Sequence, residues 1–353
     1  MVKKLVLSAF ELENGVVLRH VPVAYRTWGR LDDDGGNAVV VCHALTGDTN
    51  AVEWWSGLVG PGCPIDTDRF FVVCPNVLGS PYGSASPVTL DPHTDLPYGT
   101  DFPDATIRDT VAIHRRLLES LGVRGVAFVI GGSMGGMQVL EWAFHDDLVR
   151  ALVPVAVGAR HSAWCIGWSE AQRQAIYADS CWSGGRYAAE EPPSAGLAAA
   201  RMMAMVSYRS PAEWRARFDR RPAGEDRSST FAVESYLRYQ GEKLNRRFDA
   251  NCYVHLTRQM DSHDVTRGRG SLKGVLGSIR QPALVIGISS DVLYPVEEQR
   301  ELAEGMANAE LLILDVPYGH DSFLIERETL GRHLAGWLDR TVRADDARVG
   351  RTA

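Results

Sequence analysis

The distribution of apolar positions divides the chain into a region of strand–helix alternation and a long helical stretch. Short apolar runs rich in Val and Ile, typical of buried strands, occur at 37–43, 70–74, 126–130 and 149–156. Amphipathic helical patterns lie between them, at 106–121 and 134–144. This alternation predicts a mostly parallel sheet with helices on both faces. About the first 35 residues alternate apolar and polar side chains, which predicts antiparallel strands at one edge of that sheet.

The pattern changes after residue 162. Helical periodicity dominates there, at 168–178, 194–207, 211–218, 229–245 and 250–261. Strands return at 282–288 and 310–314, separated by a helix at 296–306. We therefore predict an α/β core in two parts, 1–162 and 278–340, with an all-helical lid domain, 163–277, inserted between them. The scattered charges of 341–353 predict a loosely ordered tail.

The most informative stretch is residues 126–136, an apolar strand followed by Gly-Gly-Ser-Met-Gly-Gly and a helical pattern. A Gly-x-Ser-x-Gly turn between a strand and a helix is the nucleophile elbow of α/β-hydrolases. Small residues at 131 and 135 allow the sharp turn that exposes the Ser133 hydroxyl. The backbone N–H of Met134, at the N-terminus of the helix, would stabilise an oxyanion. The alternative is a glycine-rich turn without catalytic chemistry.

A Ser-His-Asp triad on this fold needs an acid and then a base later in the chain. Asp291 follows the strand 282–288, and His320 follows the strand 310–314, so both lie at the sheet edge where Ser133 is expected. His320 would accept the serine proton, and Asp291 would fix the imidazole tautomer. The alternatives are a turn aspartate and a capping loop histidine. Asp315 is a rival acid, close to the same strand end.

The second oxyanion donor is expected in the loop after the first core strand. That strand ends at His43, and we assign the donor to the backbone N–H of Leu45. His43 itself fits a structural hydrogen-bonding residue better than a base.

Composition limits the classes of function. Of the 353 residues, 45% are hydrophobic and 23% charged, and the formal net charge of −7 argues against nucleic acid as a partner. An anionic co-substrate needs only a local basic patch. No apolar run approaches the ~20 residues that span a bilayer, and the N-terminus does not fit a secretory signal. Six cysteines without Cys-x-x-Cys spacing suggest a reduced, cytoplasmic protein, and no metal-ligand motif occurs.

Several long motifs together identify a family. They are His43-Ala-Leu-Thr-Gly-Asp48, Asn76-Val-Leu-Gly79, Asp101-Phe-Pro103, Gly131 to Gln138, Ala163-Trp-Cys-Ile-Gly167, Arg246-Arg-Phe-Asp-Ala-Asn251, Ser290-Asp-Val-Leu293 and Gly319-His-Asp321. From about residue 10 to about residue 340 the chain resembles the homoserine O-acetyltransferases, α/β-hydrolase-fold acyltransferases of methionine biosynthesis. Members act on homoserine, serine or deacetylcephalosporin C, with acetyl- or succinyl-CoA. The resemblance leaves both donor and acceptor open.

The resemblance implies acetyl transfer from acetyl-CoA to L-homoserine by a ping-pong mechanism, with no permanently bound cofactor. It also implies that Arg201 binds the substrate carboxylate and Asp321 the ammonium. The residues alone favour a solvated or helix-pairing arginine at 201, and Arg209 is the nearest competitor. Lys243, Arg246 and Arg247 could meet the phosphates of CoA or form a solvated helix face. The family further implies a homodimer through the lid helices. A carboxylesterase with the same triad and a non-catalytic binding module are the other classes considered.

Overall fold

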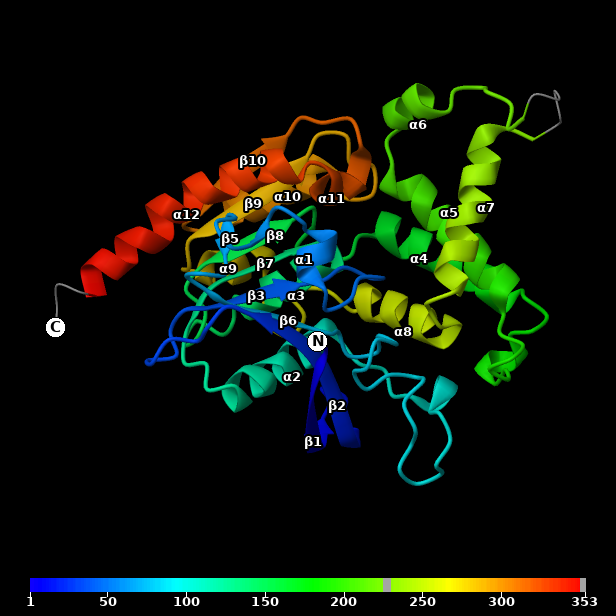
Figure 1. Ribbon diagram of the computed structural model, residues 1–353, viewed down its shortest axis with the longest axis horizontal. Helices are drawn as coiled ribbons and strands as arrows, with labels where there is room; N and C mark the ends of the chain where they lie inside the picture. Colours follow the sequence, from blue (N-terminus) through cyan, green and yellow to red (C-terminus); the bar gives the residue numbers. More distant parts are fainter. Residues whose placement is uncertain (225–229, 350–353) are drawn as a thin grey trace.

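The computed structural model describes residues 1–224 and 230–349, and its centre is an eight-stranded sheet (Figure 1). The strand order is β1-β2-β6-β3-β7-β8-β9-β10. These strands are β1 (Lys3–Glu11), β2 (Val17–Trp28), β6 (Phe71–Pro75), β3 (Ala38–Cys42), β7 (Val126–Gly132), β8 (Leu152–Val155), β9 (Ala283–Ile288) and β10 (Ala309–Leu314). β1 and β2 pair antiparallel at one edge, and the strands from β6 onward are parallel. The predicted fold class is confirmed.

Each face of the sheet is buried under helices because successive strand residues point to opposite sides. In β3, Val40 packs into a core that includes residues of α2 (Ile107–Ser120), α3 (Met134–Trp142), α9 (Leu272–Ser278) and α10 (Val296–Gly305). Val39 and Val41 pack into a second core with residues of α1 (Ala51–Trp54) and α12 (Arg327–Val349). Burial on both faces explains why the parallel strands are almost continuously apolar.

Every named element between β8 and β9 in the described residues is a helix. The first five are α4 (Ala163–Tyr177), α5 (Ser194–Tyr208), α6 (Pro211–Arg217), α7 (Ala232–Asn245) and α8 (Ala250–Asp261), with the short 3-10 turn η2 (Ser183–Gly185) after α4. α5 packs against both α4 and α7, and α4–α7 stand beside the sheet as a separate layer (Figure 1). We call α4–α7 the lid.

The helical stretch that contains the lid and α8 leaves and rejoins the core at one place. The His161 N–H donates to the His263 carbonyl at 2.8 Å, and Arg160 and Asp264 form a β-bridge beside it. α8 lies against the core, where Gln259 donates to the Leu78 carbonyl at 3.2 Å. α9 packs on α10. The insertion expected to end at 277 therefore includes one helix, α9, that belongs with the sheet.

Some helices begin or end at residues other than those predicted. α4 begins at Ala163, earlier than the predicted 168, because the Ser162 side chain accepts the Cys165 N–H and caps the helix there. The segment expected to be a loosely ordered tail is helical as far as residue 349, since α12 continues to Val349. The segment 338–349 contains neither Gly nor Pro, so no residue in it breaks the helix. Residue 229, the predicted start of one helix, lies outside the described residues.

Smaller elements complete the fold. A two-stranded sheet of β4 (Val59–Gly60) and β5 (Ile65–Asp66), the 3-10 turns η1 (Gly99–Asp101) and η3 (Gly319–Asp321), and α11 (Ser322–Ile325) escaped the sequence pattern. No helix among the described residues has the length and apolar character needed to cross a membrane.

Candidate active site

Ser133 occupies a strained turn between β7 and α3. Its backbone has φ 58° and ψ −124°, a region that residues with a side chain rarely adopt. The strand behind it leaves no room for side chains. A Cβ on Gly135 would lie 2.2 Å from the carbonyl oxygen of Cys42, and one on Gly131 would lie 2.7 Å from the same oxygen. The glycines therefore let α3 approach β3 closely, and the Ser133 side chain projects at the carboxyl edge of the sheet.

Asp291 and His320 form a buried pair. The imidazole Nδ1–H of His320 donates to Asp291 Oδ2 at 2.6 Å, and Asp291 Oδ1 accepts the backbone N–H groups of Leu293 and Tyr294 at 2.8 and 2.9 Å. Burial lowers the pKa of His320, but the Asp291 carboxylate, its hydrogen bond and Asp321 outweigh burial and raise it overall. With Nδ1 protonated, His320 Nε2 carries the lone pair, and this buried atom has no hydrogen-bond partner among the described residues. The geometry is that of a general base.

The loops that carry the acid and the base are tied to one another. Ser290, just before Asp291, donates to the Val316 carbonyl at 2.5 Å and accepts the Gly319 N–H at 3.0 Å. The rival acid Asp315 is exposed and accepts from Ser289 at 2.8 Å, so it is paired away from His320.

The loop after β3 supports the expected second donor. His43 donates from Nδ1 to the Ala44 carbonyl at 2.9 Å and accepts the Val77 N–H at Nε2 at 3.1 Å. Both ring nitrogens are thus engaged, and burial lowers the pKa of His43, which fits its interpretation as a structural residue. Within the described residues the Leu45 N–H donates no hydrogen bond to the protein. The Met134 N–H is in the first turn of α3, where it has no acceptor four residues back.

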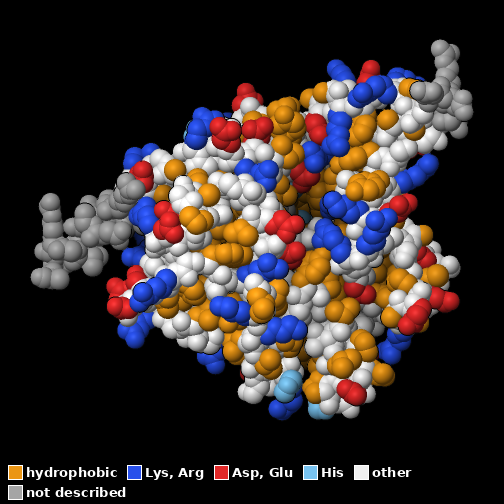
Figure 2. Space-filling view, in the orientation of Figure 1, with side chains coloured by type: hydrophobic (Ala, Val, Ile, Leu, Met, Phe, Trp, Pro, Cys, Tyr) orange, Lys and Arg blue, Asp and Glu red, His pale blue; other side chains and the backbone are white. Residues whose placement is uncertain are grey.

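A cavity of about 560 Å³ joins the core and the lid at this point. In Figure 2 charged side chains of both signs gather around the hollow between these two layers. The core contributes Cys42, Ala44, Leu45, Thr46, Gly47, Asp48, Glu53, Trp54, Gly132, Ser133, His320, Asp321, Phe323 and Leu324, and the lid contributes Arg201, Tyr208 and Lys243, with Arg247 directly after α7. The structure therefore brings Ser133, His320, Leu45, Arg201 and Asp321 to one cavity, with Asp291 buried behind His320.

The two candidate arginines differ in their partners. Arg209 is held by Glu213 at 3.2 Å and by Asp321 at 3.1 Å, and it does not line the cavity. Arg201 lines the cavity and forms no ion pair within the described residues; its guanidinium lies 5.7 Å from the ring centre of Tyr208. Of these two arginines, Arg201 is therefore the one that is free to bind an anion in the cavity, and Asp321 already shares its carboxylate with Arg209.

The three basic residues Lys243, Arg246 and Arg247 also differ in their position relative to the cavity. Lys243 and Arg247 line the cavity, whereas Arg246 is exposed outside it. Arg247 donates to the Thr46 carbonyl at 2.8 Å and to the Tyr82 hydroxyl, and so connects the lid to the loop after β3. Lys243 has no anionic partner among the described residues.

Sequence reasoning missed Tyr208 and the acidic pair Asp48 and Glu53 as cavity residues. Tyr208 lies on the same face of α5 as Arg201, two turns further along the helix, and this i,i+7 spacing is the signal that could have found it. Asp48 and Glu53 flank the turn into α1, whose four residues gave no periodic pattern.

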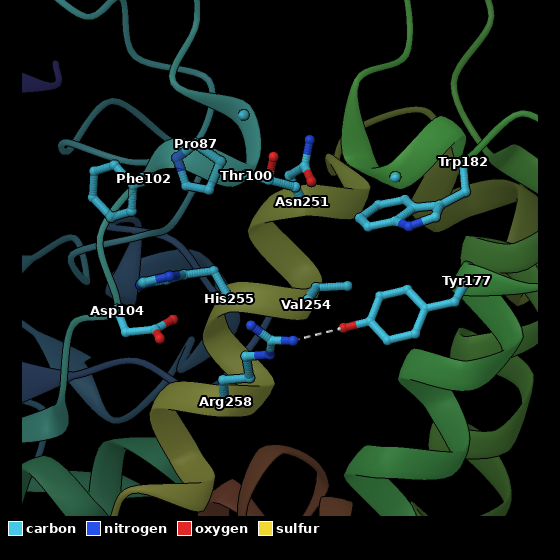
Figure 3. A pocket seen from close by; sticks show the side chains of 12 residues that line it. Pro87, Thr100, Phe102, Asp104, Tyr177, Trp182, Asn251, Val254, His255 and Arg258 are labelled. Atoms are coloured by element: carbon cyan, nitrogen blue, oxygen red, sulfur yellow. Dashed lines mark hydrogen bonds between the residues drawn. The ribbon is translucent and has the colours of Figure 1, made fainter.

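A second hollow lies at the junction of the lid with η1 and α8 (Figure 3). Its lining includes Phe102, Tyr177, Trp182, His255 and Arg258, and the Arg258 guanidinium donates to the Tyr177 hydroxyl at 3.3 Å. It shares no lining residue with the Ser133 cavity. Among the described residues, no three His, Cys, Asp or Glu side chains are grouped as metal ligands would be.

Comparison with known proteins fits this geometry. A family model described as the alpha/beta hydrolase fold matches residues 37–326. A homoserine O-acetyltransferase of Salinibacter ruber is 59% identical over 342 residues, which cover 96% of this chain and 97% of that protein. Among solved structures, the homoserine O-acetyltransferase of Bacillus anthracis superposes with a TM-score of 0.89 at 25% identity, covering 97% and 98% of the two chains. The esterase E22 superposes with a TM-score of 0.87 at 27% identity, covering 96% and 100%. Overall shape thus matches transferases and esterases alike, and neither solved structure exceeds 27% identity, whereas the Salinibacter ruber transferase is 59% identical over nearly the full length. On that evidence the chain belongs to the homoserine O-acetyltransferase family of α/β-hydrolase-fold enzymes.

Proposed function

We propose that this protein transfers the acetyl group of acetyl-CoA to the hydroxyl of L-homoserine, giving O-acetyl-L-homoserine for methionine biosynthesis. Two observations support the proposal: the relatives that are named homoserine O-acetyltransferase, and the presence of Ser133, His320 and Arg201 in one cavity. The observation that carries it is the unpaired Arg201 guanidinium inside the Ser133 cavity. A half-buried cation suits an acceptor that carries a carboxylate, which a simple ester hydrolase acting with water does not need.

The reaction proceeds in two half-reactions. In the first, His320 Nε2 takes the Ser133 proton as Oγ attacks the thioester carbonyl, and the Leu45 and Met134 N–H groups stabilise the oxyanion. The tetrahedral intermediate collapses, the C–S bond breaks, and the CoA sulfur leaves with the proton from His320. In the second, His320 takes the homoserine hydroxyl proton, the alkoxide oxygen attacks the acetyl-serine, and Ser133 regains its proton. No resident cofactor is required.

Transfer rather than hydrolysis depends on where the acceptor hydroxyl is held. Liquid water is about 55 M, whereas a well-oriented group reaches effective molarities of about 10⁵ M or more. We assign the acceptor carboxylate to Arg201 and the ammonium to Asp321, whose Oδ2 also contacts Arg209. These two groups lie beside Ser133 and His320 in the cavity and would align the hydroxyl.

We also assign the anionic part of CoA to Lys243 and Arg247, at the lid side of the cavity. Arg246 is excluded from this role because it lies outside the cavity. Asp48 and Glu53 on the core side would repel phosphate, so the nucleotide must enter along the lid.

The test is thiol release from acetyl-CoA and from succinyl-CoA, each with homoserine, serine or water as acceptor. The proposal predicts release that saturates with homoserine and acetyl-CoA and is lost in Ser133→Ala. Equal release with water alone would identify an esterase, and a preference for succinyl-CoA would identify the succinyl-transferring alternative.

We further propose a homodimer formed through the lid, and a cytoplasmic location. Large apolar side chains are exposed there, with Trp164 55%, Ile166 38%, Val206 43% and Tyr239 53% accessible. Sedimentation equilibrium should give twice the 38.8 kDa chain mass, and a charged residue in place of Tyr239 should weaken the dimer.

A further inference from the structure

The imidazole of His320 is enclosed by three aromatic rings. Tyr294 stacks on it, with ring centres 5.2 Å apart and planes at 29°. Phe323 meets it edge-on at 5.6 Å and 79°, and Tyr208 lies tilted at 5.7 Å and 40°. Tyr208 and Phe323 line the cavity, but Tyr294 does not. Tyr294 therefore touches the base from behind, on the side away from substrate.

Tyr294 is itself fixed at both ends. Its backbone N–H donates to Asp291 Oδ1 at 2.9 Å, so the same residue orients the acid and supports the base. Its side chain is buried, with 1% of the residue accessible. Its hydroxyl lies 3.0 Å from Nδ1 of His161.

His161 anchors this hydroxyl at the point where the chain leaves the core for the lid. Its Nε2 lies 3.4 Å from Ser169 Oγ and 3.6 Å from Asp261 Oδ1. Asp261 in turn pairs with Arg173 at 2.7 Å. Burial, with lesser effects of His263 and Arg173, lowers the pKa of His161 to about 3, so the ring is neutral at neutral pH. A carboxylate near Nε2 favours the proton on Nε2, so Nδ1 accepts the hydrogen bond from Tyr294.

We propose that Tyr294 is a positioning residue for the base. Its ring packs against the His320 imidazole and holds it in the orientation that directs Nε2 to the cavity, and its π face stabilises the imidazolium. The hydrogen bond to His161 holds the ring in place from the lid junction. This inference rests on the proposed role of His320 as the base. An imidazolium forms in both half-reactions, so both should depend on Tyr294, whereas acceptor binding at Arg201 should not.

The test compares Tyr294→Leu, which removes the π face, with Tyr294→Phe, which removes only the hydroxyl. Tyr253→Phe is the matched control, because Tyr253 is also fully buried and donates its hydroxyl to Gln172 at 2.5 Å, outside the cavity. Tyr294→Leu should lower kcat about tenfold or more and leave the homoserine KM within about twofold. Tyr294→Phe should lower kcat by less, about threefold, and Tyr253→Phe should leave it unchanged.

The pH profile separates positioning from general damage. The groups that face the His320 ring are Asp291, Asp321, Tyr208 and Tyr294. Losing the π face destabilises the imidazolium, so the acid limb of kcat/KM should move to lower pH in Tyr294→Leu and stay in place in Tyr294→Phe. A lost hydroxyl at a purely structural site would move neither limb.

The rate of Ser133 labelling by a fluorophosphonate measures the same base without any assumption about acceptor or CoA. Slow labelling in Tyr294→Leu supports the inference, and labelling at the wild-type rate overturns it. If the leucine variant does not fold, Tyr294→Phe decides: a kcat equal to that of Tyr253→Phe overturns the inference. Labelling that persists in Ser133→Ala would instead overturn the proposed triad.

Discussion

Replacing Ser133 with glycine should make the protein more stable than replacing it with alanine, although both variants lose the nucleophile. Alanine keeps a Cβ at φ 58° and ψ −124°, and such a conformation costs about 1–3 kcal/mol. Glycine adopts it freely but loses about 0.5–1 kcal/mol more backbone entropy on folding. The net advantage of glycine should be about 1 kcal/mol, within limits of about 0 and 2.5 kcal/mol.

The assay is thermal unfolding of the two variants under identical conditions. For a chain of 353 residues, the unfolding entropy makes 1 kcal/mol equal to about 1.3 °C in Tm. Ser133→Gly should therefore melt about 1 °C, and at most about 3 °C, above Ser133→Ala. Urea titrations of the same pair give a second measure of the difference.

Ser8 provides the matched control. It is exposed in β1 and is not among the residues with positive φ. Ser8→Gly should melt about 1 °C below Ser8→Ala, the reverse order, because only the entropy cost of glycine remains. If the order at position 133 matches the order at position 8, the elbow is not strained and the argument fails.

Three further predictions concern binding, packing and pH. Arg201→Ala should raise the homoserine KM about 30- to 1000-fold and leave the pre-steady-state burst of CoA release intact; an unchanged KM would remove Arg201 as the carboxylate ligand. Gly135→Ala should destabilise the fold by about 2 kcal/mol or more, because the new Cβ would lie 2.2 Å from a backbone oxygen, whereas Gly167→Ala, with open space at its Cβ, should not. The free energy of unfolding should be greatest above about pH 6.5 and should fall below it, by about 2 kcal/mol per group at pH 5. The reason is that burial holds the pKa of three histidines far below 6.5, so these side chains bind protons in the unfolded chain before they do in the folded one. These are His114 and His161, at about 3, and His255, at about 4. A urea midpoint that does not change between pH 7.5 and 5 would contradict the last prediction.

The sheet and the edge at which the site lies were predictable because they depend on local patterns. A strand buried on both faces is continuously apolar, as at 126–130, and chemistry at its end follows from the chain direction. Ser133 and Asp291 follow such strands, and His320 lies in the loop after the partly buried edge strand β10, so their meeting could be inferred from three separate strand ends.

What escaped prediction depends on contacts between distant segments. The Tyr294 ring meets His320 only because β9 and β10 are neighbours, and nothing in the alternation around residue 294 indicates the stacking. The competition between Arg201 and Arg209 is likewise settled by tertiary partners, since Glu213 and Asp321 hold Arg209. The start of α4, in contrast, depends on the local sequence, because the Ser162 side chain caps the helix, and this cap could have been recognised from the sequence.

The insertion also constrains the order of events during synthesis. β8 pairs with β9, yet Leu152 and its partner Ala283 are separated by the entire helical stretch. The ribosome must have made 283 of the 353 residues before that pairing can begin. Contacts of such long sequence separation close slowly, so the nascent sheet presents β8 as an open apolar edge for many seconds of elongation. A chain of this design therefore depends on protection of that edge, by early lid helices or by chaperones, more than a protein with an uninterrupted sheet.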